Sequence, residues 1–297
     1  MKTRAFGANL LPLLALMMLF ATVTIVACRK TETTAARTNS ESGTQSINST
    51  NFAYVNSDLD DKDFDDAFSD SGDCKTVTFD TSKDVYPHTK TITYNNCFSE
   101  CKDGVLNGTK VVYNYVNPDS AHAGDLIKEV TYQDFTIDSV KVSGDVKVYL
   151  VSNDPYTLHV VATRTLVISG KDGVTETVKT DHIRTLTSGG NTEDRSDDVY
   201  SVTGTSSGHE ILHGGQVAKY SVMIDPNDPV IKAADCCWRS SGTETVTIDL
   251  NSRGTKSTLT EVLDYGDGTC DNQATLSING GEAQTVTLPL RFWPLNP

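Results

Sequence analysis

Two histidines one helical turn apart are the first feature of the sequence that could carry out chemistry. Residues 209–213 read His-Glu-Ile-Leu-His, and on a helix both imidazoles would bind zinc while the glutamate activated a water molecule. The flanks oppose this interpretation, because Gly208 and Gly214 enclose only five residues and isolated helices that short are unstable. The flanking residues alternate as in strands. We therefore predict that His209–His213 is the tip of a β-hairpin, with no catalytic residue and no metal site.

Aspartates gather in two places that could bind calcium through oxygen ligands. Residues 58–73 contain eight aspartates around Leu59, Phe64 and Phe68. Asp66, however, stands where the turn of an EF-hand needs glycine, so we predict a solvated acidic segment with a short helical turn. The second place, residues 264–268, reads Asp-Tyr-Gly-Asp-Gly, a composition that is typical of an ordinary hairpin turn. We expect no cofactor at either place.

The N-terminus carries the clearest address in the sequence. Lys2 and Arg4 precede an apolar run that ends Ile25-Val26-Ala27-Cys28. This arrangement resembles the lipobox of bacterial lipoproteins, in which the signal peptide is removed and the cysteine is acylated. We therefore expect a signal peptide at residues 1–27, lipidation of Cys28 and attachment to the membrane through that lipid. The predicted location is the outer membrane, with the protein facing the periplasm or the cell surface.

The remaining cysteines point to disulfide bonds, because an extracytoplasmic compartment is oxidising. They are Cys74, Cys97, Cys101, Cys236, Cys237 and Cys270. Cys236 and Cys270 are close in the sequence and precede and follow segments expected to be adjacent in one sheet, so we predict that they pair. Cys74 is expected to pair with Cys97 or Cys101. The leftover cysteine and Cys237 either pair with each other or remain free.

A period of two dominates the chain after Cys74 and predicts an all-β fold built on antiparallel strands. Residues 140–150 show the pattern best, with apolar residues at nearly every even position. A phase change between Tyr132 and Phe135 predicts a bulge near Gln133. Residues 174–186 are polar on both faces, so we expect that strand at an edge or protruding from the sheet. The fold class is an antiparallel β-sandwich or rolled sheet.

Composition divides the chain into four parts. A flexible tether at 28–50 and the acidic segment at 51–73 follow the signal peptide, and residues 74–293 form the all-β ectodomain. A weak repeat relates Thr76–Asp80 to Thr245–Asp249, which allows two related halves at 74–150 and 236–293 joined by long strands. The net charge of −14 excludes a typical nucleic-acid-binding protein, which needs a positive field.

Two stretches carry a resemblance to a known group of proteins. The first consists of residues 198–205 followed by residues 236–243, which read Cys-Cys-Trp-Arg-Ser-Ser-Gly-Thr. The second consists of residues 264–275 and closes in Asn279-Gly280. Together they resemble an uncharacterised family of β-rich lipoproteins from the Bacteroidota. The resemblance implies that Cys236 and Cys270 match cysteines of that family, and it implies no activity.

These observations favour a non-catalytic binding or structural module, with a glycan or a protein as its ligand and no nucleic acid. The first alternative is a pilus- or adhesin-like subunit that assembles through an exposed edge strand. The second alternative is a zinc peptidase that uses His209, Glu210 and His213. An exposed row of aromatic side chains would favour the binding module over the assembly subunit.

Overall fold

The fold is known from a computed structural model of the chain, which describes Leu59 and residues 74–98, 105–138, 140–168, 175–190, 192, 195–211, 217–252 and 255–288. All of them belong to one compact unit, Asn48–Pro297. The predicted signal peptide, Cys28, the tether, Cys101 and the aspartates of residues 58–73 lie outside the described residues. No helix among the described residues is both long and apolar enough to cross a membrane.

In the part of the chain that the structure describes, fourteen strands form one antiparallel sheet, which confirms the all-β prediction. The first seven are β1 (Lys75–Phe79), β2 (His88–Phe98), β3 (Val105–Asn114), β4 (Leu126–Ile137), β5 (Val140–Asn153), β6 (Tyr156–Ile168) and β7 (Thr175–Ser188). The others are β8 (Val199–Ile211), β9 (Val217–Ile224), β10 (Val230–Ala233), β11 (Arg239–Ser252), β12 (Thr255–Asp267), β13 (Gln273–Ile278) and β14 (Gln284–Thr287). Within the described residues, two short 3-10 helices, Pro118–Ser120 and Arg195–Asp197, lie in the connections between strands.

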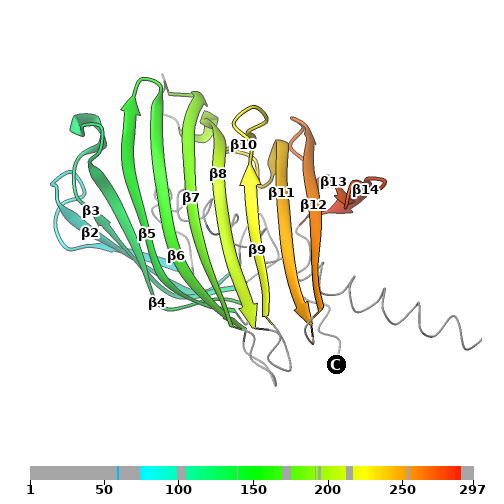
Figure 1. Cartoon of the computed structure of the whole chain (residues 1–297). Coiled ribbons are helices and arrows are strands. Elements are labelled where there is room, and N and C mark those ends of the chain that lie inside the picture. The colour runs from blue at the N-terminus through cyan, green and yellow to red at the C-terminus, as the bar shows by residue number, and fades with distance from the viewer. Residues whose placement is uncertain are drawn as a thin grey trace, which may run out of the picture. The chain divides into compact units, whose positions relative to one another are not determined.

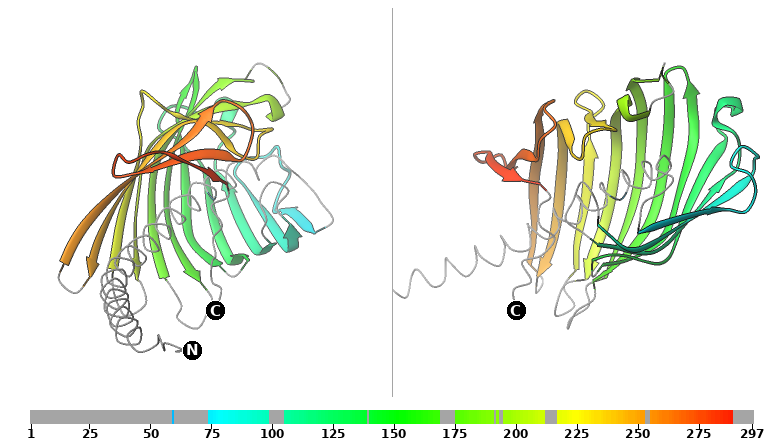
Figure 2. Two further views of the ribbon diagram at one scale, coloured as in Figure 1. Left: turned by 90° about the vertical axis from the view of Figure 1, so that its right-hand side faces the viewer. Right: turned by 180° about the vertical axis from the view of Figure 1, so that it is seen from behind.

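The strands follow one another as a meander from β1 to β8. Strands β9 and β10 then share one position, because both pair with β8 on one side and with β11 on the other. The long strands lie side by side in a strongly curved sheet (Figure 1), and β13 and β14 turn away from them at one edge (Figure 2). Every described strand therefore belongs to the same sheet.

The alternation predicted for residues 140–150 is observed in β5, where Val140, Val142, Val146, Val148 and Leu150 are buried and the residues between them are more exposed. The predicted bulge is confirmed as well, since the register of β4 against β5 shifts between Thr131 and Thr136. The strand predicted from residues 217 to 224 has the same bounds as β9. Period-two patterning thus located these strands correctly.

One prediction about the sheet is wrong. Residues 174–186 were expected at an edge, yet β7 lies between β6 and β8 in the middle of the sheet. Its even-numbered residues from 176 to 184 are buried, and most of them are polar or charged: Glu176, Thr180, His182 and Arg184. The strand looks polar on both faces because its buried face is built from polar residues. The face of the sheet that carries these residues and the hydrophobic core is called the inner face below, and the opposite face the outer face.

Candidate functional site

The histidine motif lies on a strand and not on a helix. Strand β8 continues through Ile211 and pairs with β9, with His209 opposite Lys219 and Glu210 opposite Ala218. The hairpin prediction is therefore confirmed for residues 209–211, while Leu212 and His213 lie outside the described residues. Among the described residues, no three His, Cys, Asp or Glu side chains are grouped closely enough to hold a metal ion.

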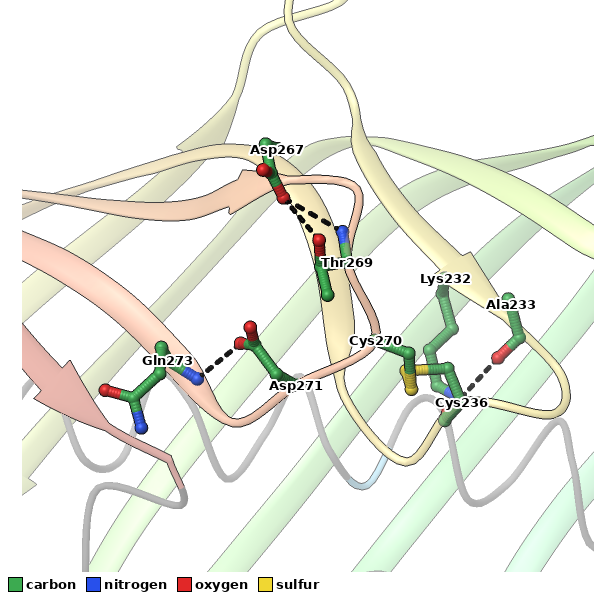
Figure 3. Close-up of a disulfide and its surroundings, with 8 residues drawn as sticks. All are labelled: Lys232, Ala233, Cys236, Asp267, Thr269, Cys270, Asp271 and Gln273. Atoms are coloured by element: carbon green, nitrogen blue, oxygen red, sulfur yellow. Dashed lines mark hydrogen bonds between the residues drawn. A yellow bond between two sulfur atoms is a disulfide. The ribbon is translucent and has the colours of Figure 1, made fainter.

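The aspartate-glycine turn after β12 uses its carboxylates to build the turn. Asp264 accepts a hydrogen bond from the backbone N–H of Gly266 (2.8 Å), and Asp271 accepts one from the N–H of Gln273 (2.8 Å). Asp267 accepts from both the N–H and the hydroxyl of Thr269, and these bonds lower the pKa of its carboxyl. Figure 3 shows the carboxylates of Asp267 and Asp271 beside the Cys236–Cys270 disulfide. This pattern is that of the ordinary turn predicted from the sequence.

Two predicted cysteine pairs are present. Cys236 and Cys270 are bonded with their Cα atoms 5.7 Å apart (Figure 3), and Cys74 is bonded to Cys97 with Cα atoms 5.1 Å apart. Cys237 is also disulfide-bonded, so the alternative that it remains free is wrong. The Cys74–Cys97 bridge joins the start of β1 to the end of β2, which pairs with it, and the Cys236–Cys270 bridge joins the segment before β11 to the segment after β12 in the same way. The two strand pairs that carry the weak sequence repeat are therefore closed in the same way.

Sequence reasoning missed a series of buried polar contacts that cross the inner face. Arg164 on β6 donates from Nε to the hydroxyl of Tyr132 on β4 (3.1 Å), and the residue of β5 directly opposite Arg164 is Gly144. Tyr220 on β9 donates to Glu176 on β7. The strand between them contributes Gly208, where an added Cβ would lie 2.4 Å from the Tyr220 ring. In both places a glycine on the middle strand leaves room for a long side chain to cross that strand and bond to a residue two strands away.

A similar buried group lies next to the Cys236–Cys270 bridge. The guanidinium of Arg239 donates to one carboxylate oxygen of Glu244, and Tyr265 donates to the other (3.0 Å). Lys232 donates to the backbone carbonyls of Ala233 (3.0 Å) and Cys236. These contacts satisfy buried charges locally. We assign this group a structural role in fixing the corner that the disulfide closes.

The outer face carries the group of side chains best placed to meet a ligand. Four rings lie near the same ends of β3, β5 and β6: Tyr113, Tyr115, Tyr149 and His159. Tyr113 is 40% exposed and Tyr115 38% exposed, whereas the rings of Tyr149 and His159 are half-buried against each other with centroids 6.1 Å apart. Together with Glu129, Lys147 and Asp181, these side chains are called the aromatic patch below.

Register and hydrogen bonds hold the polar members of the aromatic patch between the rings. Tyr113, Glu129 and Lys147 lie directly opposite one another on β3, β4 and β5. Tyr115 donates to Glu129 (2.6 Å) and His159 Nε2 lies 2.7 Å from Asp181 Oδ1. The hydrogen bond to Glu129, with partial burial and the carboxylate charge, raises the pKa of Tyr115 to about 12. The phenol of Tyr115 therefore remains protonated, and donates to Glu129, up to a higher pH than an ordinary tyrosine.

The patch could not have been found in the sequence, because its members come from five strands and only the observed register brings them together.

Comparisons of the chain with family models, with curated proteins and with solved structures give no match.

Proposed function

We propose that the protein is a lipid-anchored, extracytoplasmic, non-catalytic binding module of the outer membrane, and that the aromatic patch is its binding site for a glycan. Two features support the location: the Ile25-Val26-Ala27-Cys28 sequence, and disulfides such as Cys236–Cys270, which persist in oxidising compartments. The resemblance to β-rich lipoproteins of the Bacteroidota is part of this proposal.

The observation that carries the proposal is the exposed pair of tyrosines at the end of β3, Tyr113 and Tyr115, with the carboxylate of Glu129 beside them. Tyrosine offers an apolar ring and a polar hydroxyl at little entropic cost. The apolar C–H face of a sugar ring packs against such rings, and its hydroxyls donate to carboxylates. Tyr113 and Tyr149 lie two strands apart, which is about 10 Å across a sheet. An extended saccharide could therefore contact both rings while it met Glu129 between them.

The arrangement of charges favours binding over cleavage. Glu129 and Asp145 are neighbouring carboxylates at the patch, and the ammonium of Lys147 lies 3.9 Å from one and 3.7 Å from the other. A glycosidase keeps the space between its two carboxyl groups for the scissile bond. Because Lys147 contacts both groups here, this pair suits a polar binding surface.

The assembly subunit is the weaker alternative. The edge strand it required, residues 174–186, is the central strand β7. The two strands at the ends of the described order, β1 and β14, have five and four residues, which gives little backbone for strand addition. The zinc peptidase is weaker still, because residues 209–211 are extended and its chemistry needs a helix.

Binding is tested by electrophoresis of the native protein through gels that contain soluble polysaccharides, using xylan, β-glucan, mannan and starch as probes. We expect at least one polysaccharide to retard the protein. The apparent affinity of the double variant Tyr113→Ala/Tyr149→Ala for that polysaccharide should be at least tenfold lower. Phe98→Ala is the matched control, because Phe98 is exposed and lies outside the patch. Unretarded migration in every gel, or retention of binding by the double variant, would show that the glycan assignment is wrong.

The anchor is tested separately with Cys28→Ser. The substitution removes the thiol that would be acylated, so the protein should lose its lipid mass and move from the membrane fraction to the soluble one. Mass spectrometry and fractionation measure both. A variant that stays in the membrane with an intact signal segment contradicts the lipoprotein proposal and leaves the glycan test unaffected.

A further inference from the structure

Four members of the aromatic patch lie on one line that crosses the outer face from strand to strand. Residues directly opposite one another on neighbouring strands form this line: Tyr113, Glu129, Lys147, Val161 and Asp181 on β3 to β7. The same pairing continues beyond the patch to Thr205 on β8 and Met223 on β9. These seven side chains are called the outer row. Because neighbouring strands lie about 4.8 Å apart, the outer row spans about 29 Å.

The outer row is accessible at both ends. Tyr113 is 40% exposed at one end, and Met223 is 52% exposed at the other. Thr205, directly opposite Met223, is exposed as well, and so is Asp181 between the two ends. Methionine offers an adaptable apolar surface and threonine offers a hydroxyl, which are the two kinds of contact that the tyrosines offer at the other end. A chain that binds the aromatic patch therefore meets matching contacts on β8 and β9.

The charged groups along the outer row are paired with one another. The ammonium of Lys147 lies 3.9 Å from Glu129 and 3.7 Å from Asp145, and His159 Nε2 lies 2.7 Å from Asp181 Oδ1. Sugar hydroxyls can donate to these carboxylates and accept from the ammonium without adding a charge. A uronic acid or a sulfated sugar would instead bring a negative charge to the carboxylates of a protein whose net charge is −14, which is repulsive. The outer row therefore favours uncharged sugars.

We propose that the outer row is the full length of the glycan site, and that it takes an extended, uncharged chain of about seven sugars across the strands from β3 to β9. This inference rests on the proposed function of the aromatic patch and extends that site by Thr205 and Met223. The length follows from the strand spacing, because one sugar of an extended 1,4-linked chain advances by roughly one inter-strand distance. The sheet is strongly curved (Figure 1), so the row suits a single soluble chain that bends along it.

Two oligosaccharides of about three and about seven sugars, prepared from the neutral polysaccharide that retards the protein, test the length of the site. Isothermal titration calorimetry measures their Kd values on the protein isolated from the membrane in detergent. The longer chain should bind at least tenfold more tightly. Thr205→Ala/Met223→Ala should weaken binding of the longer chain at least fivefold and leave the Kd of the shorter one unchanged, because a short chain held by Tyr113 and Tyr149 does not reach β8.

The matched control is His209→Ala/Lys219→Ala. These two exposed residues lie directly opposite each other on the same strands, β8 and β9, but about 14 Å along the strands from the outer row. Their truncation should leave both Kd values unchanged. Equal Kd values for the two oligosaccharides, or a control variant that loses as much affinity as Thr205→Ala/Met223→Ala, would refute the extended site.

The methyl group of Met223 gives a direct measurement, because Met223 is the only methionine after residue 18. In protein labelled at its methionine methyl groups, the NMR signal that disappears in Met223→Ala should shift when the longer oligosaccharide is added and stay in place with the shorter one. A signal that responds to neither refutes the extension to β9. Retardation that depends on Tyr113 and Tyr149 would still support the glycan site in that case.

The charge of the ligand is tested with polygalacturonate, an acidic chain, in the same gels. It should not retard the protein. Retardation equal to that by the neutral polysaccharide would show that the uncharged class is wrong, whereas the absence of retardation by every polysaccharide would refute both this inference and the proposed function.

Discussion

The two faces of the sheet use polar side chains in opposite ways, and β7 shows both uses within one strand. On the inner face Glu176, His182 and Arg184 are buried. Glu176 accepts a hydrogen bond from Tyr220 on β9, two strands away, and His182 is hydrogen-bonded to Ser206 on the neighbouring strand β8. On the outer face Lys179 and Asp181 are exposed, and Asp181 belongs to the aromatic patch. The inner polar groups are therefore fixed by the fold, whereas the outer ones remain accessible to a ligand.

The comparison teaches that glycines lie opposite the large polar and aromatic side chains that are buried on the inner face in the middle of this sheet. Gly144, Gly204 and Gly208 lie opposite Arg164, His182 and Tyr220 respectively. Each has so little free space that an added Cβ would meet a neighbouring strand within 2.4 Å. Large polar side chains can be buried here because the residues facing them have no side chain of their own.

The largest expected effect is that of Gly144→Ala. The new Cβ would lie 2.0 Å from the carbonyl oxygen of Thr163, and the residue has a φ of +117°. Because backbone must move, we expect the free energy of unfolding to fall by about 4 kcal/mol or more. Denaturant titration followed by circular dichroism measures the loss.

Gly266→Ala is the control for that substitution. Gly266 also has a positive φ, +97°, but nothing lies within 4 Å of its Cβ position. Only conformational strain should appear there, with a loss of about 1–2 kcal/mol. Equal losses at Gly144 and Gly266 would mean that the close approach of the β6 backbone to Gly144 contributes nothing.

The sequence predicted the strands whose two faces differ in hydrophobicity. Strands such as β5 and β9 were located because apolar residues alternate with polar ones. Cys236 and Cys270 were paired correctly because the strands that they flank, β11 and β12, are consecutive. Strand β7 was misplaced because its inner-face residues are as polar as its outer-face residues. The aromatic patch depends on the register of five strands, which no local pattern records.

A second prediction compares buried and exposed glutamates by the same Glu→Gln change. Glu261 on β12 is fully buried and lies opposite Val246 on β11 and Ile278 on β13. Burial raises the pKa of its carboxyl from 4.5 to about 7. Between these values the folded protein binds more protons than the unfolded chain, so stability falls as pH rises through this window.

Glu261→Gln removes this titration, so the free energy of unfolding of the variant should decline much less than that of the parent between pH 4.5 and 7. At pH 8 it should exceed the parent by up to about 3 kcal/mol. Urea unfolding at several pH values measures both quantities, and Glu282→Gln, on an exposed residue, should follow the parent at every pH. A parent slope that survives in Glu261→Gln would show that other groups cause it.

The smallest effect on stability is expected on the outer face, at Glu129 of the aromatic patch. Glu129→Gln keeps an acceptor for Tyr115 but removes the carboxylate charge that helps to raise the pKa of that phenol to about 12. The midpoint of Tyr115, followed by NMR of labelled tyrosine rings, should fall toward 10, while Asp181→Asn should leave it unchanged. The free energy of unfolding should change by no more than about 0.5 kcal/mol, because the pair is exposed to solvent. A loss as large as that at a buried inner-face contact would mean that Glu129 supports the fold, and the patch would then be less free to bind a glycan.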